Sequence, residues 1–401
     1  MSQTYAPIRP TDHVPEALII EFDATHDTGM KTDLFARLQA VRQSSPSIAY
    51  SRHSGGHWLV FDEDAIREVL GSPERFTSTH ISQGSMAQGG PEMIPLGMDP
   101  PQHGPWRMVL NKYLGPKKIK QLEGVIQQKA DEFVARLVGK TECDFVKDVA
   151  EPMPIFIFMA LMGLPFEHFA EFRELAVRVL GGSDPGAPPS PEIIQANIKI
   201  MTILAELIEQ RRQQPLDDLV SGLITETVNG EPIGPEQLMS ICYVLFLGGL
   251  DTVTNAVSFG MRVLAQDAAL QQQLRDNPQE LGDLVEQLLR QTAFVNTQRM
   301  VKVDTELQGV AMRAGDIVWN ISWAGSNSVD GTSDSPRHLA FGAGAHMCVG
   351  MHLARMELRA LYQAWFRHIG PFSLLEDEDT MQGGNIMHIK RLRLKLDARQ
   401  A

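Results

Sequence analysis

The chain has 401 residues, 43% of them hydrophobic, which is ample material for a buried core. Its formal net charge of −13 argues against nucleic acid as a partner, because phosphate binding needs a basic face. No linker or internal repeat divides the sequence, so we expect residues 1–401 to form a single domain.

The three cysteines, Cys143, Cys242 and Cys348, are an odd and widely spaced set, which is not a disulfide framework. Such a set suits the reducing cytoplasm. The first residues lack the apolar stretch of a signal peptide, and the most apolar run, Ile241 to Leu250, is too short to span a bilayer. We therefore expect a cytoplasmic protein that has no membrane contact.

Helical patterning dominates the chain, and three β segments interrupt it. Gly55 and Gly56 separate residues 48–52 from residues 57–61, which predicts a β-hairpin. A second short β pair is predicted from Leu307 to Trp319, with its turn at residues 314–316. A late strand is indicated by Ile389, Leu392, Leu394 and Leu396. The predicted fold class is mainly α with minor β.

Two stretches rich in glycine, proline and serine are predicted to be loops. They are residues 82–97 and residues 181–191, whose composition disfavours helix and strand alike. Such segments serve either as ordinary surface connections or as lids over a buried site. The sequence leaves both readings open.

A long helix is predicted from Pro235 to about Ala265, since proline suits the first helical position. At 1.5 Å per residue it would be roughly 45 Å long and would cross the domain. Its middle reads Gly248-Gly249-Leu250-Asp251-Thr252, which places two glycines, a carboxylate and a hydroxyl inside an apolar span. The glycines alone cost on the order of 1–2 kcal/mol relative to alanine.

The most informative segment runs from His338 to Gly350 and contains Cys348. Its glycines force an irregular backbone, and a strongly helical run from Met351 to His368 follows. Cys348 therefore precedes a helix N-terminus, whose free N–H groups are expected to stabilise a thiolate. A thiolate is a suitable axial ligand for haem iron, because it favours O–O cleavage. The alternative is an inert buried thiol.

The spacing Phe341-x-x-Gly344-x-His346-x-Cys348-x-Gly350 resembles the haem-binding loop of the cytochrome P450 family. The segment from Gly248 to Thr252 resembles that family's oxygen-activation motif, and residues 98–107 resemble a loop and helix at the haem edge. The resemblance covers nearly the whole chain and is closest to the bacterial camphor hydroxylase group. It implies a long central helix crossing over a buried haem b, with Cys348 as the iron ligand.

The resemblance also implies roles for other residues. Asp251 would relay protons from solvent, and Thr252 would hydrogen-bond the oxygen being activated. The alternative for Thr252 is back-bonding within a kinked helix, and Arg173 or Arg178 are candidate partners of Asp251. The haem propionates need cationic donors, which by resemblance are His103, Arg107, Arg299 and His346.

The substrate pocket is expected along the central helix, after Arg290 and under the first lid. Its candidate residues are Met93, Leu96, Val244, Leu247 and Val295, each of which could equally be core. Camphor hydroxylases present a tyrosine from this lid, but Pro91 stands at the matching position here. The expected substrate is therefore a small apolar molecule, terpenoid-like or aromatic, rather than camphor.

The chain departs from the family at the buried Glu-x-x-Arg pair, because Gln287 stands where the glutamate belongs, three residues before Arg290. Glu286 is rotated about 100° around the helix and cannot simply replace it. Gln287 could still hydrogen-bond Arg290. The segment between Asn327 and His338 is also shorter than usual and lacks the family arginine there.

The resemblance implies a monooxygenase that uses O2 and electrons from a [2Fe–2S] ferredoxin. That donor would dock near the cysteine loop, at Arg107, Arg355 and Arg359. Two alternatives stay open, a haem-thiolate sensor without turnover and a peroxide-driven peroxygenase. The second needs no proton relay, so the presence of Asp251 and Thr252 argues against it.

Overall fold

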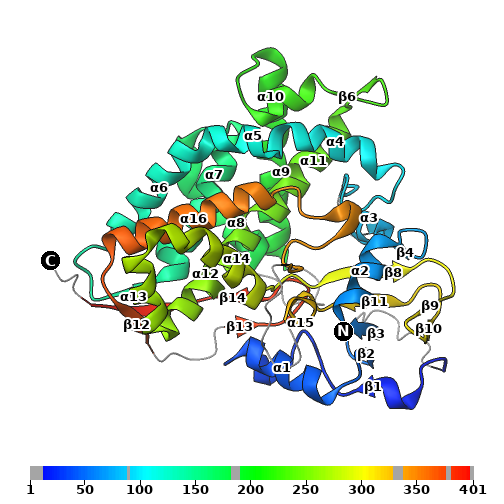
Figure 1. Ribbon diagram of the computed structural model, residues 1–401. Coiled ribbons are helices and arrows are strands. Elements are labelled where there is room, and N and C mark those ends of the chain that lie inside the picture. Colours follow the sequence, from blue (N-terminus) through cyan, green and yellow to red (C-terminus); the bar gives the residue numbers. More distant parts are fainter. Residues whose placement is uncertain (1–11, 88–90, 182–189, 328–336, 376–380, 398–401) are drawn as a thin grey trace.

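Figure 1 shows the computed structural model of the chain, which describes residues 12–87, 91–181, 190–327, 337–375 and 381–397. Helices fill most of the molecule, and a twisted sheet with a few short helices forms the remaining side. This arrangement confirms the predicted fold class, mainly α with minor β.

The helices are distributed along the whole chain. Their bounds are α1 Leu34–Ser44, α2 Glu63–Gly71, α3 Thr79–Ala87, α4 His103–Leu114, α5 Pro116–Ile119, α6 Glu123–Ala135, α7 Pro152–Met162, α8 Phe169–Gly181, α9 Pro191–Gln213, α10 Leu219–Ile224, α11 Pro235–Gly249, α12 Asp251–Gln266, α13 Ala268–Asp276, α14 Leu281–Gln291, α15 Ser322–Ser326 and α16 Met351–His368. A π-helical turn, η4 Val146–Ala150, leads into α7.

The main sheet has the strand order β1-β2-β3-β11-β8-β4. Its strands are β1 Ile19–Ile20, β2 Ile48–Ser51, β3 His57–Val60, β4 Phe76–Thr77, β8 Thr297–Val301 and β11 Ile317–Asn320. Strands β2 and β3 pair antiparallel, which confirms the predicted hairpin. Its turn requires glycine at Gly56, where φ is +87° and a Cβ would lie 2.3 Å from the Tyr50 hydroxyl oxygen.

The second predicted β pair exists, but its predicted turn is wrong. Strands β9 Thr305–Leu307 and β10 Val310–Met312 pair across Gln308 and Gly309, which both have positive φ. The residues after Gly315 instead form β11, which joins the main sheet between β3 and β8. That pairing is long-range, so the local turn signal could not reveal it.

The late strand is confirmed as two short pieces. Strand β14 His388–Ile389 pairs with β13 Met381–Gln382, and β15 Arg393–Leu396 lies between β12 Phe372–Leu374 and β5 Glu142–Asp144. A separate two-stranded ribbon, β6 Thr227–Val228 with β7 Glu231–Pro232, precedes α11.

The first predicted loop is helical over its first part, since α3 covers residues 79–87. The Asp99 carboxylate accepts hydrogen bonds from the Ser78 N–H and the Thr77 hydroxyl just before this helix, and that tertiary anchor outweighs the local composition. Residues 91–97 are irregular, as predicted. Most of the second predicted loop, residues 182–189, lies outside the described residues.

The long helix is confirmed, with an interruption at Leu250 (φ −98°, ψ −62°) that separates α11 from α12. By length and apolar composition the stretch from Pro235 to Gln266 could cross a membrane. It lies at the centre of the helical region, among α7, α9 and α16, where a core helix needs the same composition (Figure 1).

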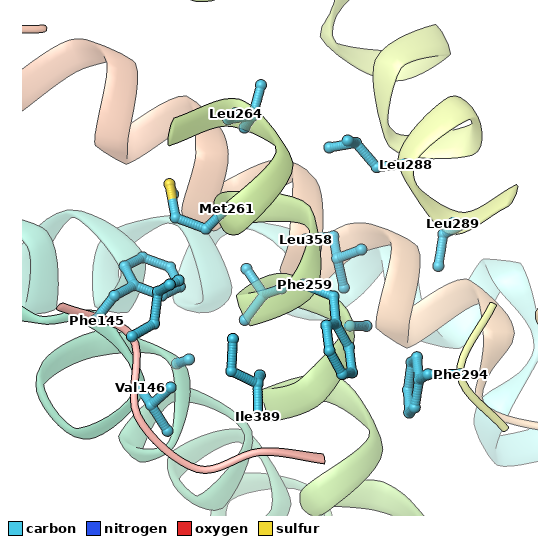
Figure 2. Packing of buried hydrophobic residues seen from close by; sticks show 14 of the residues in the cluster. Phe145, Val146, Phe259, Met261, Leu264, Leu288, Leu289, Phe294, Leu358 and Ile389 are labelled. Carbon is cyan, nitrogen blue, oxygen red and sulfur yellow. The ribbon is translucent and has the colours of Figure 1, made fainter. Parts of the chain in front are cut away.

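Helix α12 packs between α14, α16 and η4 in the largest apolar cluster (Figure 2). Phe259 and Phe294 face each other there, and Phe145 and Ile389 close the other side of α12. Each fully buried side chain of this size contributes about 1.5–3 kcal/mol. At Gly260 a Cβ would lie 2.1 Å from the Tyr362 hydroxyl, so glycine permits the close approach of α12 and α16.

Candidate active site

The cysteine loop joins the sheet region to α16. The Cys348 N–H donates to the Phe341 carbonyl at 2.9 Å, and α16 begins three residues later at Met351, as predicted. Gly344 has φ +69°, and a Cβ there would lie 2.3 Å from the Leu70 carbonyl oxygen. The loop is therefore pressed against the end of α2 in a conformation that only glycine adopts without strain.

The Cys348 thiol lies at the end of this loop, directly before α16. Its side chain is accessible, yet it is surrounded by so much protein that burial raises the pKa of the thiol. The Gly350 N–H and the charges of Arg107 and Arg355 oppose this rise without cancelling it. The helix terminus therefore acts in the predicted direction, towards the thiolate, and the remaining stabilisation of the thiolate has to come from another group. Bonding to a metal ion would supply that stabilisation, because coordination deprotonates a thiol.

The middle of the long helix also presents open space. Gly248 and Gly249 are exposed although Phe246 and Leu250 beside them are buried, and a Cβ added to either glycine would meet nothing within 4 Å. The Thr252 hydroxyl donates to the Gly248 carbonyl at 2.7 Å, which is the back-bonding alternative. Its oxygen keeps lone pairs that can accept a further hydrogen bond.

Four basic side chains gather between α4, β8 and the cysteine loop. The rings of His103 and His346 lie 4.3 Å apart, and both histidines carry electrostatic interactions with Arg299 and Arg107. Arg107 donates to the Met347 carbonyl and Arg299 to the Gln298 carbonyl. The structure thus brings together the residues that the sequence predicted for the propionates.

This cluster has more cations than anions, since Asp99 is a single carboxylate that interacts electrostatically with both Arg299 and His103. Arg299 is 6% exposed, and the described residues place no carboxylate within 4 Å of its guanidinium. Burial lowers the pKa of Arg299 to about 10, and burial together with the neighbouring cations lowers the pKa of His346 to about 3. The His346 Nε2 is also buried without a hydrogen-bond partner.

These observations fit a haem. A buried guanidinium with no carboxylate of the described residues within 4 Å, and a buried imidazole nitrogen that accepts or donates no hydrogen bond among them, are groups that two propionate carboxylates would satisfy. The Cys348 sulfur lies in the same loop as His346 and can serve as the axial ligand. The ring of Phe341, also in this loop, lies 4.5 Å under the Arg355 guanidinium, which holds the start of the loop against α16.

Asp251 begins α12 and has different partners from those predicted. Its carboxylate lies 3.3 Å from the His388 Nδ1 and accepts a hydrogen bond from Asn255 at 3.0 Å. Arg173 binds Glu151 instead, and Arg178 binds Glu174, so both predicted cationic partners of Asp251 are wrong. His388 and Asn255 gave no signal in the sequence, because one is a lone histidine on a short strand and the other looks like helix surface.

The five predicted pocket residues differ in how deeply they are buried. Val244 and Leu247 are half-buried on α11, Val295 is half-buried and forms a β-bridge with Ile386, and Leu96 is 40% exposed. Met93 is 6% exposed and belongs to the packed cluster that contains Phe246, which is the core-packing alternative. Ile386 shares the bridge with Val295, and sequence reasoning missed it.

Glu286 forms an ion-pair cluster behind the cysteine loop. Its carboxylate accepts two hydrogen bonds from Arg355, at 2.6 and 2.8 Å, and lies 3.2 Å from the His338 Nε2. Gln287 is exposed on the same helix, which confirms that the two positions point in different directions. Arg355 thus connects α14 to α16 and to the Phe341 ring rather than facing solvent freely.

Removing the Glu286 charge is expected to weaken this cluster. Although burial alone would raise the pKa of Glu286, the hydrogen bonds from His338 and Arg355 lower it to about 2. Its stabilising contribution is therefore complete above the unfolded-state pKa near 4.3 and is lost as the pH falls towards about 2. Solvent screens the half-buried pair, so we expect Glu286→Gln to lose about 1 kcal/mol at pH 6.

Urea unfolding of both chains between pH 6 and pH 3 measures this difference, which should shrink as the pH falls. Glu174→Gln, which removes an exposed pair within α8, is the matched control and should lose less than about 0.5 kcal/mol. An equal loss in the two variants, or a Glu286→Gln loss that does not change with pH, would contradict the cluster's role.

Comparison with known proteins gives the same family at each level. The cytochrome P450 family model matches residues 324–385, which contain the cysteine loop. The chain is 30% identical to the probable cytochrome P450 127A1 of Sinorhizobium fredii, over 95% of both chains. It is 27% identical to the linalool 8-monooxygenase of Pseudomonas putida, over 91% of this chain and 95% of that one.

The solved structures agree with the sequence relatives. CYP101C1 superposes with a TM-score of 0.86 at 30% identity, covering 97% of this chain and all of that one. CYP101J2 also has a TM-score of 0.86, at 28% identity, over 97% of this chain and 99% of that one. With an accessible cysteine directly before α16, a cationic cluster that fits propionates and relatives that match along nearly its whole length, the chain belongs to the cytochrome P450 family of haem-thiolate monooxygenases.

Proposed function

We propose that this monooxygenase hydroxylates a compact apolar molecule of terpenoid or aromatic type. The observation that carries the proposal is the set of accessible apolar side chains beside the open glycines of α11. Val244 and Leu247 belong to that helix, and Val295 lies across from Ile386. Side chains of this kind favour an apolar substrate of complementary shape. The linalool 8-monooxygenase relative supports a terpenoid-like substrate.

Haem binding in this proposal uses Cys348 for the iron and His103, Arg107, Arg299 and His346 for the propionates. When bound, the haem supplies oxygen activation and O–O bond cleavage. The protein's own contribution is to orient the substrate, to exclude water and to deliver protons. Thr252 accepts a hydrogen bond at the open face of the helix, and Asp251, one residue before it, holds the exchangeable proton.

We further propose that electrons come from a small [2Fe–2S] ferredoxin that docks on the cysteine side of the molecule. Arg107 is half-buried and donates to the Met347 carbonyl, while the side chains of Met108 and Met347 are 64% and 39% exposed. An exposed apolar centre next to a cation suits a transient protein interface. Arg359 is exposed and contributes a further positive charge to this face, whereas Arg355 forms an ion pair with Glu286.

The proposed location is the cytoplasm, where such a donor is reduced. Cys143 and Cys242 are buried free thiols, and burial raises the pKa of each to about 12, which makes both unreactive. Neither cysteine therefore needs an oxidising compartment.

Thr252→Ala tests the proton-delivery part of this function. The variant should keep its haem and its substrate-induced spectral change, but a larger share of the electrons should end in hydrogen peroxide. The measurement is product and peroxide formed per NADH, with a reductase and a ferredoxin as donors. Ser258→Ala, which removes a buried hydroxyl six residues further along α12, is the control and should keep the wild-type ratio.

The same assay separates the two alternative functions. A sensor would show no product with either NADH or peroxide, and a peroxygenase would turn over faster with peroxide alone. An unchanged product-to-NADH ratio in Thr252→Ala would overturn the proposed role of Thr252.

A further inference from the structure

A cavity with a mainly apolar lining and several polar side chains lies beside the first turn of α12. Its volume is about 210 Å³, and its lining comes from η4, α7, α8, α12 and the β13–β14 hairpin. Asp251 and Asn255 line it, and Thr252 does not, so the cavity lies on the face of α12 away from that hydroxyl. Val177, 40% exposed, and the exposed Lys390 also line it, which places its mouth at the surface.

This cavity can hold several water molecules, since a single water needs only about 10–15 Å³ of such volume and two to four polar partners. Polar groups are available on opposite walls. Glu151 stands at the start of α7, Asp251 and Asn255 on α12, and His388 and Lys390 on or beside β14. Water in the cavity would therefore reach from the surface to the Asp251 carboxylate.

His388 is held against this carboxylate by a defined set of contacts. Its Nδ1 lies 3.3 Å from the Asp251 Oδ2 and 3.3 Å from the Asn255 Nδ2. Asn255 in turn donates to the Asp251 Oδ1 and main-chain carbonyl, and its Oδ1 accepts the Ile389 N–H at 3.0 Å. One asparagine thus fixes both α12 and strand β14, and it sets the distance between the two titratable side chains.

The contacts suit two protonation states of the ring. A protonated His388 donates its Nδ1–H to the Asp251 carboxylate. In the neutral ring with the proton on Nε2, Nδ1 becomes an acceptor and can take a hydrogen bond from the Asn255 amide. The imidazole and the carboxylate are 22% and 14% exposed, so their attraction is less screened than that of a surface pair.

No other cationic side chain within the described ranges lies within 4 Å of Asp251. Arg173 forms an ion pair with Glu151 at 2.6 Å and therefore does not pair with Asp251. The side chains of α8 that line the cavity, Ala176, Val177 and Leu180, are apolar. Lys390 lines the cavity but makes no ion pair with Asp251. Histidine ordinarily changes its charge between pH 5 and 8, whereas an arginine here could hold the carboxylate but could not release a proton.

We propose that His388 is the positioning residue that holds Asp251 at this cavity and recharges it with protons from cavity water. The inference rests on the proposed role of Asp251. In the transfer the Nδ1–H bond of the imidazolium breaks, the electron pair stays on Nδ1, and a new O–H bond forms on the Asp251 Oδ2. A hydronium ion that reaches the ring through cavity water then reprotonates Nδ1 and leaves a water molecule. The Oδ2–H bond of Asp251 breaks as its proton passes towards Thr252, which restores the carboxylate.

The pair itself is tested without turnover by a double-mutant cycle on the haem-loaded protein. Urea unfolding of His388→Gln, Asp251→Asn and the combined variant is measured at pH 6 and pH 8.5. At pH 6 the combined variant should lose less stability than the sum of the single losses, because the singles each break the same ion pair. At pH 8.5 the losses should add. If the stability losses add at both pH values, the side chains of His388 and Asp251 do not form the proposed ion pair.

The proton role is tested by the pH profile of product formed per NADH. In the wild type this yield should fall as the pH rises through the histidine range, and His388→Gln should start lower and lose that dependence. His368→Gln is the matched control, because His368 forms a comparable pair with Asp131 at 2.9 Å far from the cavity, and it should keep the wild-type profile.

These outcomes distinguish a failure of the inference about His388 from a failure of the proposed role of Asp251. If Asp251→Asn leaves the yield unchanged, the proposed role of Asp251 is wrong. If Asp251→Asn lowers the yield but His388→Gln keeps the wild-type pH profile, at any level of activity, only the inference about His388 is overturned. A flat profile in His388→Gln with a normal profile in His368→Gln supports it.

Discussion

The Cys348→Ser variant is expected to fold and to take up haem, but to lose the long-wavelength Soret band of a CO-bound thiolate complex. Serine preserves the size of the side chain and the Cys348 N–H to Phe341 hydrogen bond, so the loop should keep its shape. A hydroxyl does not ionise near neutral pH and binds iron weakly. Monooxygenation should fall to background, as measured by product per NADH.

Cys143→Ser is the matched control for this substitution. Cys143 is a buried free thiol on β5, and burial raises its pKa to about 12. The control should keep the thiolate spectrum, although a buried hydroxyl lowers the stability of the fold somewhat. A CO spectrum that follows Cys143 rather than Cys348 would contradict the assignment.

The Arg299→Met variant is expected to change stability in opposite directions with and without haem. In the haem-free chain the buried Arg299 guanidinium has only a longer-range interaction with Asp99, and no carboxylate of the described residues lies within 4 Å of it. An apolar side chain of similar length should therefore raise the free energy of unfolding by about 1–3 kcal/mol. In the haem-loaded chain the same change removes a propionate partner. Haem loss should become roughly 10- to 100-fold faster, which corresponds to about 1.4–2.8 kcal/mol.

Two measurements check this reversal of sign. Urea unfolding gives the stability of the haem-free chains, and transfer of haem to an excess of apomyoglobin gives the rate of haem loss. Arg313→Met is the control, because Arg313 forms an exposed pair with Asp12 and should affect neither quantity by much. Destabilisation of the haem-free chain by Arg299→Met would show that interactions within the protein already stabilise the guanidinium, and would contradict its proposed role as a propionate partner.

The parts of the site that the sequence predicted correctly are encoded locally. The glycines around Cys348 and the helical run after it determine a loop that leads into a helix, and α16 begins and ends where the pattern places it. The hairpin at Gly55 and Gly56 is local in the same way, because three adjacent residues with positive φ, Ser54 to Gly56, form the turn. The four propionate candidates came from the family resemblance, and the structure brings them together.

The errors concern contacts between residues far apart in the chain. Asp251 meets His388 across 137 positions, and β11 joins the sheet beside β3 and β8 rather than forming a local pair. Periodicity and turn chemistry carry no information on such pairings. Glu286 shows the same limit. Its one-residue offset from Gln287 predicted that its side chain points in a different direction, but it did not predict the ion pairs with Arg355 and His338.

The central claim, a bond between the Cys348 sulfur and the haem iron, is tested most directly by X-ray absorption at the iron edge of the haem-loaded chain. We expect one sulfur scatterer at bonding distance in addition to the four porphyrin nitrogens, and its disappearance in Cys348→Ser. An iron shell made of nitrogen and oxygen alone in the unmodified chain would contradict the account.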